Sequence, residues 1–359
     1  MPESAPAGRE SLVDRPGYHS PQVDVAVRLN TNESPEGPSA EYRAELSRLA
    51  GGLELNRYPD RRASLLRRGI AARHDLSEEN VFCANGSNEV LMCLLLFFGG
   101  AGRKALVFEP TYALHRHIAE LSGTEVVLGK RDERFAIEPG PAAELVARYR
   151  PAVVFACSPN NPTGNLELLE LLGDLAAAAA PGLLVIDEAY GQFSPESATS
   201  LLGEHENLAV VRTFSKSWAL AGLRLGYLLS SSEVVAGCER SSLPYHLGSF
   251  TQAAGLAALA HEEEMTARTS RLLQERERLA RRLEALAVET WPSSANFILF
   301  RPRSRGGHEV WEGLLSRSVL VREVSSFPRL EDCLRVTVGT REENDAFLEA
   351  LAQVLEGPR

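Results

Sequence analysis

The sequence predicts an α/β protein with a mostly parallel, doubly wound sheet and a smaller α+β domain beside it. Between residues 105 and 230, apolar runs rich in β-branched residues alternate with helical patterns, which is typical of a parallel sheet covered by helices on both faces. Near residue 250 the pattern changes to a long amphipathic stretch followed by three shorter strand-like runs. With 359 residues, 44% of them hydrophobic, the chain can bury a core for both units.

The chain is expected to divide into three parts. Residues 1–40 show little periodicity and are interpreted as an N-terminal arm and part of the small domain. Residues 41–250 form the large domain, and residues 251–359 form the small C-terminal domain. The first twenty residues lack the apolar core of a signal peptide, and the longest apolar run, "VLMCLLLFF", is too short to span a bilayer.

The first element that suggests a site is "NGSNEVLMCLLLFF" at 85–98. Gly86 allows a close backbone approach, and Ser87 and Asn88 begin a helix whose free N–H groups suit an anion. Buried strands are then predicted, in chain order, at 105–110, 124–129, 152–159, 183–190, 208–215 and 223–230. The alanine run at 176–180 suits a helix between two of them.

The second unit begins with a long amphipathic helix predicted over 262–286. Three strands are expected after it, at 296–300, 319–323 and 333–339. Periodicity thus distinguishes the two units, because the strands of the first are nearly all apolar whereas this helix has one apolar stripe.

Charge and cysteine content exclude several function classes. A net charge of −10 argues against a broad surface for nucleic acid or an anionic membrane. The five cysteines are odd in number, spread along the chain and without a CxxC pair, which favours a reducing cytoplasm over a disulfide or zinc framework. His115 and His117 form an HxH, but residues two apart on a helix do not face each other, so no metal site is expected.

Polar residues follow three of the predicted strands. Asn161 follows 152–159, Asp187 lies at the end of "LLVID", and Ser215 and Lys216 follow "LAVVRTF". Ligands of open α/β sheets bind beyond the carboxyl ends of the strands, so these side chains are expected to meet at one edge.

Each of these residues also has an ordinary structural interpretation. Ser87 could cap a helix, Asp187 a turn, and Lys216 and Arg224 could be solvated surface cations. Lysine is rare here, however: only three of the 38 basic residues are lysines. Four separate coincidences on one sheet edge are less plausible than one shared site.

Pyridoxal phosphate chemistry requires all four groups. Its aldehyde forms an imine with a lysine amine, its pyridine nitrogen pairs with a carboxylate, and its phosphate needs a helix N-terminus, hydroxyls and an arginine. The lysine pKa, normally near 10.4, must fall by about three units toward neutrality through burial and nearby positive charge such as Arg224. Arginine cannot replace the lysine because it stays protonated.

The motifs resemble those of the histidinol-phosphate aminotransferases, which are pyridoxal-phosphate-dependent enzymes of fold type I. They occur in the family's order from about residue 15 to 347: "YHSPQ", "LNTNESPEGPS", "NRYPD", "NGSNE", "EPTY", "SPNNPTG", "DEAYGQF", "RTFSK", "LAGLRLGYL", "LPYHLGS", "SANFILF" and "CLRVTVGT". "DEAY" with "SK" and a following arginine marks the wider superfamily, whereas "YHSPQ", "RYPD" and "LPYHL" indicate this branch.

The resemblance implies roles in cofactor binding. Lys216 would hold the cofactor and move the proton, Asp187 would pair with the pyridine nitrogen, and Tyr112 would stack on the ring. The ring hydroxyl would be bonded by Tyr190 and Asn161. The phosphate would be held by Gly86, Ser87, Asn88, Ser215 and Arg224, with Tyr58 of a second subunit.

The resemblance also implies the substrates and a homodimer. Arg335 would clamp the anionic group of the substrate, helped by Arg322, by Asn161 and by Tyr18 of the partner subunit. The reaction would be amino transfer between L-glutamate and imidazole acetol phosphate, giving 2-oxoglutarate and L-histidinol phosphate. A guanidinium binds carboxylate and phosphate with similar geometry, so one arginine can serve both substrates.

Four positions depart from the family pattern. Glu36 places an acid where an uncharged residue is usual, Trp218 is bulkier than usual, Ala219 stands where glycine is common, and Asn88 replaces an aspartate. These departures leave open an aromatic or specialised-metabolism aminotransferase or a threonine-phosphate decarboxylase on the same fold. A cofactor-binding regulator is a third possibility, but no fused helix-turn-helix module is evident in the 25 or so residues before "LNTNE".

Overall fold

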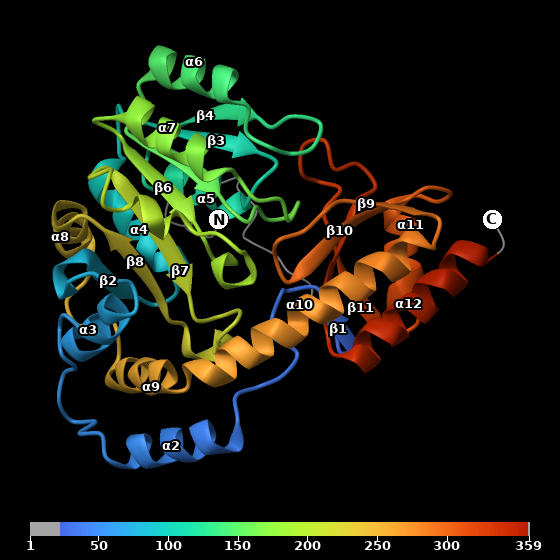
Figure 1. Ribbon diagram of the computed structural model, residues 1–359, viewed down its shortest axis with the longest axis horizontal. Helices are drawn as coiled ribbons and strands as arrows, with labels where there is room; N and C mark the ends of the chain where they lie inside the picture. The colour runs from blue at the N-terminus through green and yellow to red at the C-terminus, as the bar shows by residue number, and fades with distance from the viewer. Residues whose placement is uncertain (1–21, 358–359) are drawn as a thin grey trace, which may run out of the picture.

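The computed structural model describes residues 22–357 and contains two sheets, which Figure 1 shows side by side. Helix α10 (Glu262–Glu284) runs from the larger unit to the smaller one (Figure 1). It is amphipathic, as the sequence predicted, and buries Met265, Leu272 and Leu279 along one stripe.

The larger sheet has seven strands in the order β2-β8-β7-β6-β5-β3-β4. The strands are β2 (Val81–Ala84), β3 (Lys104–Glu109), β4 (Glu125–Lys130), β5 (Val153–Cys157), β6 (Leu183–Asp187), β7 (Leu208–Thr213) and β8 (Gly226–Ser230). The pairs that β8 makes with β2 and β7 are antiparallel and the other four pairs are parallel, so the prediction of a mostly parallel sheet is confirmed. The sequence analysis missed β2, which is only four residues long.

Helices cover both faces of this sheet because side chains of successive strand residues point to opposite faces. One core contains residues of α4, α5 and α8, and the other contains residues of α3, α6, α7 and α9. The helices are α2 (Ala40–Gly51), α3 (Ser64–Ala72), α4 (Ser87–Phe98), α5 (Ala113–Leu121), α6 (Pro139–Tyr149), α7 (Leu169–Ala179), α8 (Ser232–Ser241) and α9 (Ser249–Ala260). Short 3₁₀ turns lie at Glu78–Asn80, Gly191–Phe193, Ala198–Leu201 and Ala221–Leu223.

The smaller sheet has five strands in the order β1-β11-β12-β10-β9. The strands are β1 (Val27–Leu29), β9 (Val288–Thr290), β10 (Phe297–Pro302), β11 (Val319–Glu323) and β12 (Leu334–Thr337), and α11 (Gly307–Leu315) and α12 (Arg341–Glu356) complete the unit. β1 pairs in parallel with β11, nearly 300 residues further along the chain. The division of the chain at residues 40 and 250 stays a prediction, and α9 spans the later boundary.

No helix within residues 22–357 combines the length and apolar character needed to cross a membrane.

Candidate active site

A cavity of about 710 Å³ lies where the carboxyl ends of β5, β6 and β7 meet the smaller sheet. It brings together most of the predicted site residues: Ser87, Asn88, Tyr112, Asn161, Asp187, Tyr190, Ser215, Lys216, Arg224, Arg322 and Arg335. The smaller unit contributes the two arginines, and the stretch 30–33 after β1 also lines the cavity. The expected convergence at this sheet edge is therefore present.

Lys216 is buried beside the stretch that follows β1. Its Nζ donates to the carbonyl oxygen of Thr31 at 2.9 Å. Burial lowers the pKa of Lys216 to about 8, helped first by the charge of Arg335 and less by that of Arg224, while Glu33 opposes the shift. The sequence analysis expected Arg224 to bias the amine; the larger charge effect comes from Arg335, which is distant in sequence.

Asp187 is held in one orientation by two donors. Its Oδ1 accepts from the backbone N–H of Ala189 at 3.0 Å, and its Oδ2 lies 2.9 Å from Nε2 of His115. The ring of His115 is fully buried and stacks on Phe155, with centroids 4.9 Å apart and planes 6° apart. Since an ionised carboxylate only accepts, the proton of this bond belongs to His115.

His115 is a site residue that the sequence analysis missed, because it considered this histidine only as half of an HxH metal motif. The sequence offered one signal. In the helix that begins just after Tyr112, His115 stands three and four residues before Ile118 and Ala119, and this spacing places it on the buried, apolar side of the helix. The ring of Tyr112 meets that of His115 edge to face at 5.5 Å, and the Tyr112 hydroxyl donates to Oδ1 of Asn88 at 3.3 Å.

The start of α4 forms a tight cradle with Arg224. Gly86 has φ 83°, and a Cβ placed there would lie 2.6 Å from Nη2 of Arg224. Nη1 of Arg224 donates to Oγ of Ser215 at 3.3 Å. The free N–H groups at the start of a helix, two hydroxyls and a guanidinium therefore surround one small volume, which suits an anion.

Arg335 lines the cavity and connects the smaller unit to the larger one. Its Nη1 donates to Oδ1 of Asn161 at 2.5 Å and its Nη2 to the carbonyl oxygen of Asn30 at 2.8 Å. Nδ2 of Asn161 in turn donates to the hydroxyl of Tyr190 at 3.4 Å. Arg322 is the direct cross-strand partner of Arg335 in the β11–β12 pair, so two guanidinium groups lie on adjacent strands.

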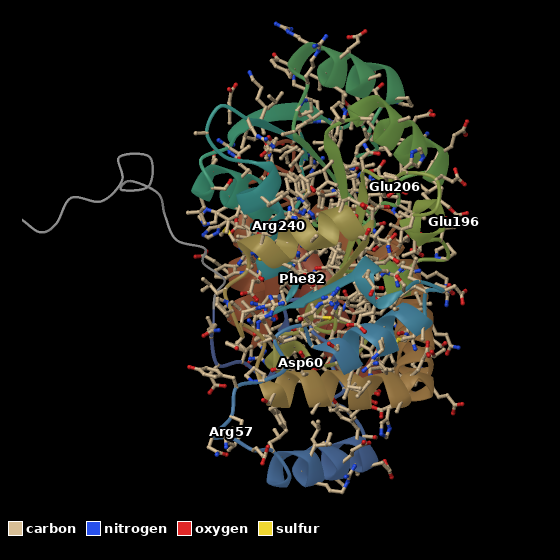
Figure 2. The ribbon with its side chains drawn as sticks, turned by 90° about the vertical axis from the view of Figure 1, so that its left-hand side faces the viewer. Arg57, Asp60, Phe82, Glu196, Glu206 and Arg240 are labelled. Atoms are coloured by element: carbon tan, nitrogen blue, oxygen red, sulfur yellow. The ribbon has the colours of Figure 1, made fainter. Side chains whose placement is uncertain are left out.

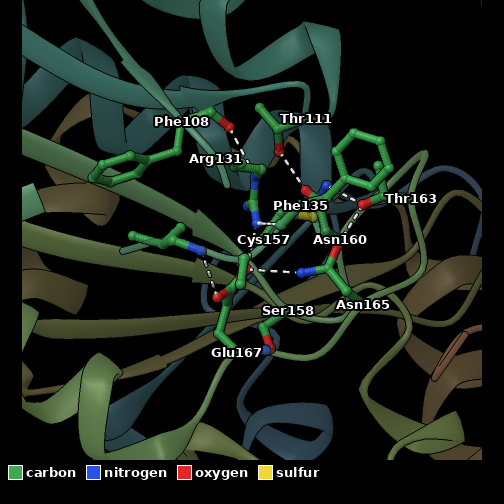
Figure 3. Close-up of polar contacts among 12 residues, drawn as sticks. Phe108, Thr111, Arg131, Phe135, Cys157, Ser158, Asn160, Thr163, Asn165 and Glu167 are labelled. Atoms are coloured by element: carbon green, nitrogen blue, oxygen red, sulfur yellow. Dashed lines mark hydrogen bonds and ion pairs between the residues drawn. The ribbon is translucent and has the colours of Figure 1, made fainter. Parts of the chain in front are cut away.

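The loop that carries Asn161 rests on a buried polar network (Figure 3). Asn160 accepts from Thr111 at 2.7 Å and donates to the carbonyl oxygen of Pro110 at 3.0 Å and to Thr163 at 2.6 Å. The buried ion pair between Arg131 and Glu167 closes the network. These bonds hold Asn160 in place, and Asn161 is the next residue in the chain. The loop therefore presents Asn161 to the cavity in a fixed position.

The two residues expected to act across a subunit boundary are placed differently from the rest. Tyr58 is 81% exposed, stacks on Tyr245 with centroids 4.6 Å apart, and does not line the cavity of its own chain. Tyr18 lies outside the described residues.

The departures from the family pattern lie away from the cavity, apart from Asn88. Glu36 is exposed and pairs with Arg271 at 2.6 Å, which offsets the repulsion of an anion that the sequence suggested. Trp218 is buried against Phe214, with ring centroids 5.0 Å apart. Ala219 has φ 58°, a left-handed conformation that explains why glycine is common there.

The residues fit pyridoxal phosphate at three points. Lys216 offers an amine whose pKa is lowered to about 8, Asp187 offers a buried carboxylate, and the cradle brings the Arg224 guanidinium so close to the backbone of Gly86 that a Cβ there would collide with it. All three line or adjoin one cavity of sufficient size.

Comparisons with known proteins identify the family of the chain. The family model for aminotransferase class I and II matches residues 24–351. Histidinol-phosphate aminotransferases of Frankia casuarinae and Thermobifida fusca are each 44% identical, over 97% and 96% of this chain and 90% and 94% of their own. The structure of the Clostridium acetobutylicum histidinol-phosphate aminotransferase has the same fold, with a TM-score of 0.85 at 23% identity over 92% of this chain and 99% of that one.

The fold and the site together define an aminotransferase of class I and II that depends on pyridoxal phosphate. Within that class, the chain belongs to the histidinol-phosphate aminotransferase family. An aromatic aminotransferase, a decarboxylase or a regulator is not favoured by these relatives.

Proposed function

We propose that the protein transfers an amino group between L-glutamate and imidazole acetol phosphate, giving 2-oxoglutarate and L-histidinol phosphate. One observation carries the proposal: Arg322 and Arg335 lie on adjacent strands and line the same cavity as Lys216. Both substrates bear an anionic group, and guanidinium binds carboxylate and phosphate alike. The relatives above are named for this reaction.

The cofactor's phosphate would lie in the cradle formed by Ser87, Asn88, Ser215 and Arg224 beside Gly86. Placed there, it would meet the positive end of the α4 dipole and the guanidinium. Gly226 packs directly against the start of α4, because a Cβ there would lie 2.2 Å from the N of Ser87. The N–H groups, hydroxyls and guanidinium of the cradle suit a small oxygen-rich anion.

The rest of the cavity would orient the ring. Asp187 would bond the pyridine nitrogen, with the carboxylate held by His115 and Ala189. Tyr112 would stack on one face, and Tyr190 and Asn161 would bond the ring hydroxyl. When bound, pyridoxal phosphate supplies an electron sink for the bond broken at the substrate's Cα.

Lys216 would then hold the cofactor's aldehyde carbon and act as the proton carrier. With its pKa lowered to about 8, a substantial fraction of the Nζ groups is neutral near physiological pH. The neutral amine would accept the proton from the substrate's Cα, and the resulting ammonium would donate it to the cofactor's former aldehyde carbon, so a pKa near the working pH suits both halves of the transfer. An ordinary lysine would be almost wholly protonated and a poor base.

Arg335 would bind the substrate's carboxylate or phosphate, with Arg322 and Asn161 beside it. The guanidinium is presented by two bonds, to Asn161 and to the carbonyl of Asn30, so it is oriented before substrate arrives. Preorganised donors lose less conformational entropy on binding.

The working unit would be a homodimer in the cytoplasm. Tyr58 would complete the partner's phosphate site, and Tyr18 would reach the partner's substrate. In support, Tyr58 and Tyr245 stack on each other and are both exposed to solvent. Figure 2 views this side of the molecule and labels Arg57 and Asp60, which flank the Tyr58-Pro59 dipeptide. Exposed aromatic side chains of this kind are common at protein interfaces.

The test is a comparison of amino donors. Protein loaded with pyridoxal phosphate is supplied with 2-oxoglutarate and, in parallel, with L-histidinol phosphate, phenylalanine or tyrosine, and glutamate is measured. We expect kcat/KM for histidinol phosphate to exceed that for phenylalanine or tyrosine by at least about tenfold. A phosphate offers the two guanidinium groups one more acceptor oxygen and more negative charge than a carboxylate does, and one charge-assisted hydrogen bond is worth about 1.5 to 3 kcal/mol. Lys216→Ala serves as the inactive control. Equal or greater turnover of phenylalanine or tyrosine would contradict the proposal.

A further inference from the structure

Asn32 is a buried asparagine that links the smaller sheet to Tyr190. It is 1% exposed and has φ 55°, a left-handed conformation that asparagine tolerates better than most residues. Its backbone oxygen accepts from Nδ2 of Asn296 at 3.1 Å, and its Nδ2 donates to the Tyr190 hydroxyl at 2.8 Å. The last bond is shorter than the 3.4 Å bond from Asn161 to the same hydroxyl.

Thr337 fixes which way the Asn32 amide points. The backbone N–H of Asn32 donates to Oγ1 of Thr337 at 3.0 Å, so this hydroxyl accepts there and keeps its own proton to donate. That proton goes to Oδ1 of Asn32 at 3.1 Å, and Thr337 makes no other side-chain hydrogen bond within residues 22–357. Flipping the amide would leave the Thr337 proton without this acceptor, so the N–H side faces Tyr190.

The Asn161 amide is fixed by the same reasoning. A guanidinium has donors and no acceptor, so the atom of Asn161 that faces Arg335 must be oxygen. Its N–H side therefore also faces Tyr190. The tyrosine oxygen thus receives two N–H donors, and its single proton must go to a third group.

We propose that Asn32 is a positioning residue that directs the hydroxyl proton of Tyr190 into the cavity, so that Tyr190 donates to the cofactor's ring oxygen. This inference rests on the proposed function, because it needs the cofactor in the cavity. Asn32 acts through Tyr190, by occupying the acceptor side of the tyrosine hydroxyl. It also ties Tyr190 to Thr337, two residues beyond Arg335 on β12.

The ionisation of Tyr190 is consistent with a donor role. Burial raises the pKa of Tyr190 to about 12, against the lowering effects of Arg335 and of the bond from Asn32. The hydroxyl therefore keeps its proton at neutral pH. A bond accepted from Asn32 makes that proton more acidic and so a better donor.

The experiment compares Asn32→Gly and Asn32→Asp in the protein loaded with pyridoxal phosphate. Glycine tolerates the left-handed φ and removes the amide, whereas aspartate keeps the shape but can only accept, which turns the tyrosine proton away from the cavity. The measurement is the pH at which the visible absorption of the bound cofactor is half changed. A bond donated to the ring oxygen stabilises its deprotonated form and lowers this pH, so weakening the bond raises it.

We expect Asn32→Gly to raise the pH of the transition by about half a pH unit and Asn32→Asp to raise it by about one pH unit or more. The smaller shift corresponds to a weakened hydrogen bond to a charged oxygen, and the larger shift to the loss of that bond. Asn296→Ala is the matched control, because it removes a bond to the same segment without touching the amide. It should leave the transition in place. Thermal unfolding of each variant identifies any that has lost its fold, and the glycine variant then carries the test.

Tyr190→Phe separates positioning from a direct effect. In that background, Asn32→Gly should no longer move the transition, and the shift caused by Asn32→Asp should fall to the part due to its charge. Undiminished shifts in the phenylalanine background, or no shift from either variant of Asn32, would overturn the inference. If Tyr190→Phe moves the transition and the Asn32 variants do not, the proposed function survives and this inference fails. If the wild-type protein takes up no cofactor, both fail.

Discussion

His115 should matter for cofactor binding although it does not line the cavity. Replacing it by phenylalanine keeps a flat ring stacked on Phe155 but removes the donor 2.9 Å from Asp187. Among residues 22–357, the carboxylate of Asp187 would then retain the backbone N–H of Ala189 as its one donor. A hydrogen bond to a buried charged group is worth about 1.5 to 3 kcal/mol, so the carboxylate's interaction with the cofactor should weaken by roughly 10-fold to 150-fold.

The assay is titration of the apoprotein with pyridoxal phosphate, followed by absorption or tryptophan fluorescence. His115→Gln, which can still donate, should recover part of the affinity. His117→Ala, on the same helix but half-exposed, is the matched control and should change affinity less than twofold, because it has no contact with Asp187. A folded His115→Phe protein with wild-type affinity would refute the argument that His115 holds the carboxylate.

Three further predictions concern the cradle, the amine and the subunit boundary. Gly86→Ala should reduce cofactor affinity at least about tenfold, because its Cβ would lie 2.6 Å from Arg224. Gly102→Ala is the control, because Gly102 has a similar φ but open space around it, and it should leave the affinity unchanged. Equal losses of affinity in the two variants would point to backbone strain instead. The rate at which Lys216 captures the cofactor should rise about tenfold per pH unit below the pKa of the amine and level off above about pH 8. Arg335→Gln should move the midpoint of this pH profile upward, because the charge of Arg335 lowers the pKa of Lys216. An unmoved midpoint would contradict the assigned cause. Mixing Tyr58→Ala and Lys216→Ala subunits should restore activity that neither homodimer shows, and no recovery after verified exchange would place Tyr58 outside the partner's site.

Much of the fold could be predicted because its signals are local. The parallel strands of the large sheet are apolar on both faces, and each is separated from the next by a helical pattern, so periodicity identifies them. β2 escaped notice because "VFCA" is short and lacks such a run. Residues 1–40 were assigned partly to the small domain, but β1 and its pairing with β11 were not predicted, because no local pattern encodes that contact.

The candidate site divides in the same way. Lys216 and Asp187 stand directly at strand ends, where topology alone brings them together. The bonds that orient them are made by residues far away in the chain: Thr31 to Lys216, and His115 to Asp187. The first contact depends on how the two units pack, and the second on how α5 packs against the large sheet, so sequence spacing alone does not give either bond.

Arg335 connects substrate binding to the reactivity of Lys216. Its positive charge is the largest electrostatic cause of the lowered pKa of Lys216, after burial. An anion bound to Arg335 would offset that charge, and the pKa of Lys216 would rise accordingly, so the amine becomes a stronger base when a substrate is in place. The same anion competes with Asn161 for the guanidinium's donors. Because Asn161 also bonds Tyr190, the group that recognises the substrate is coupled to both the proton carrier and the group that orients the cofactor.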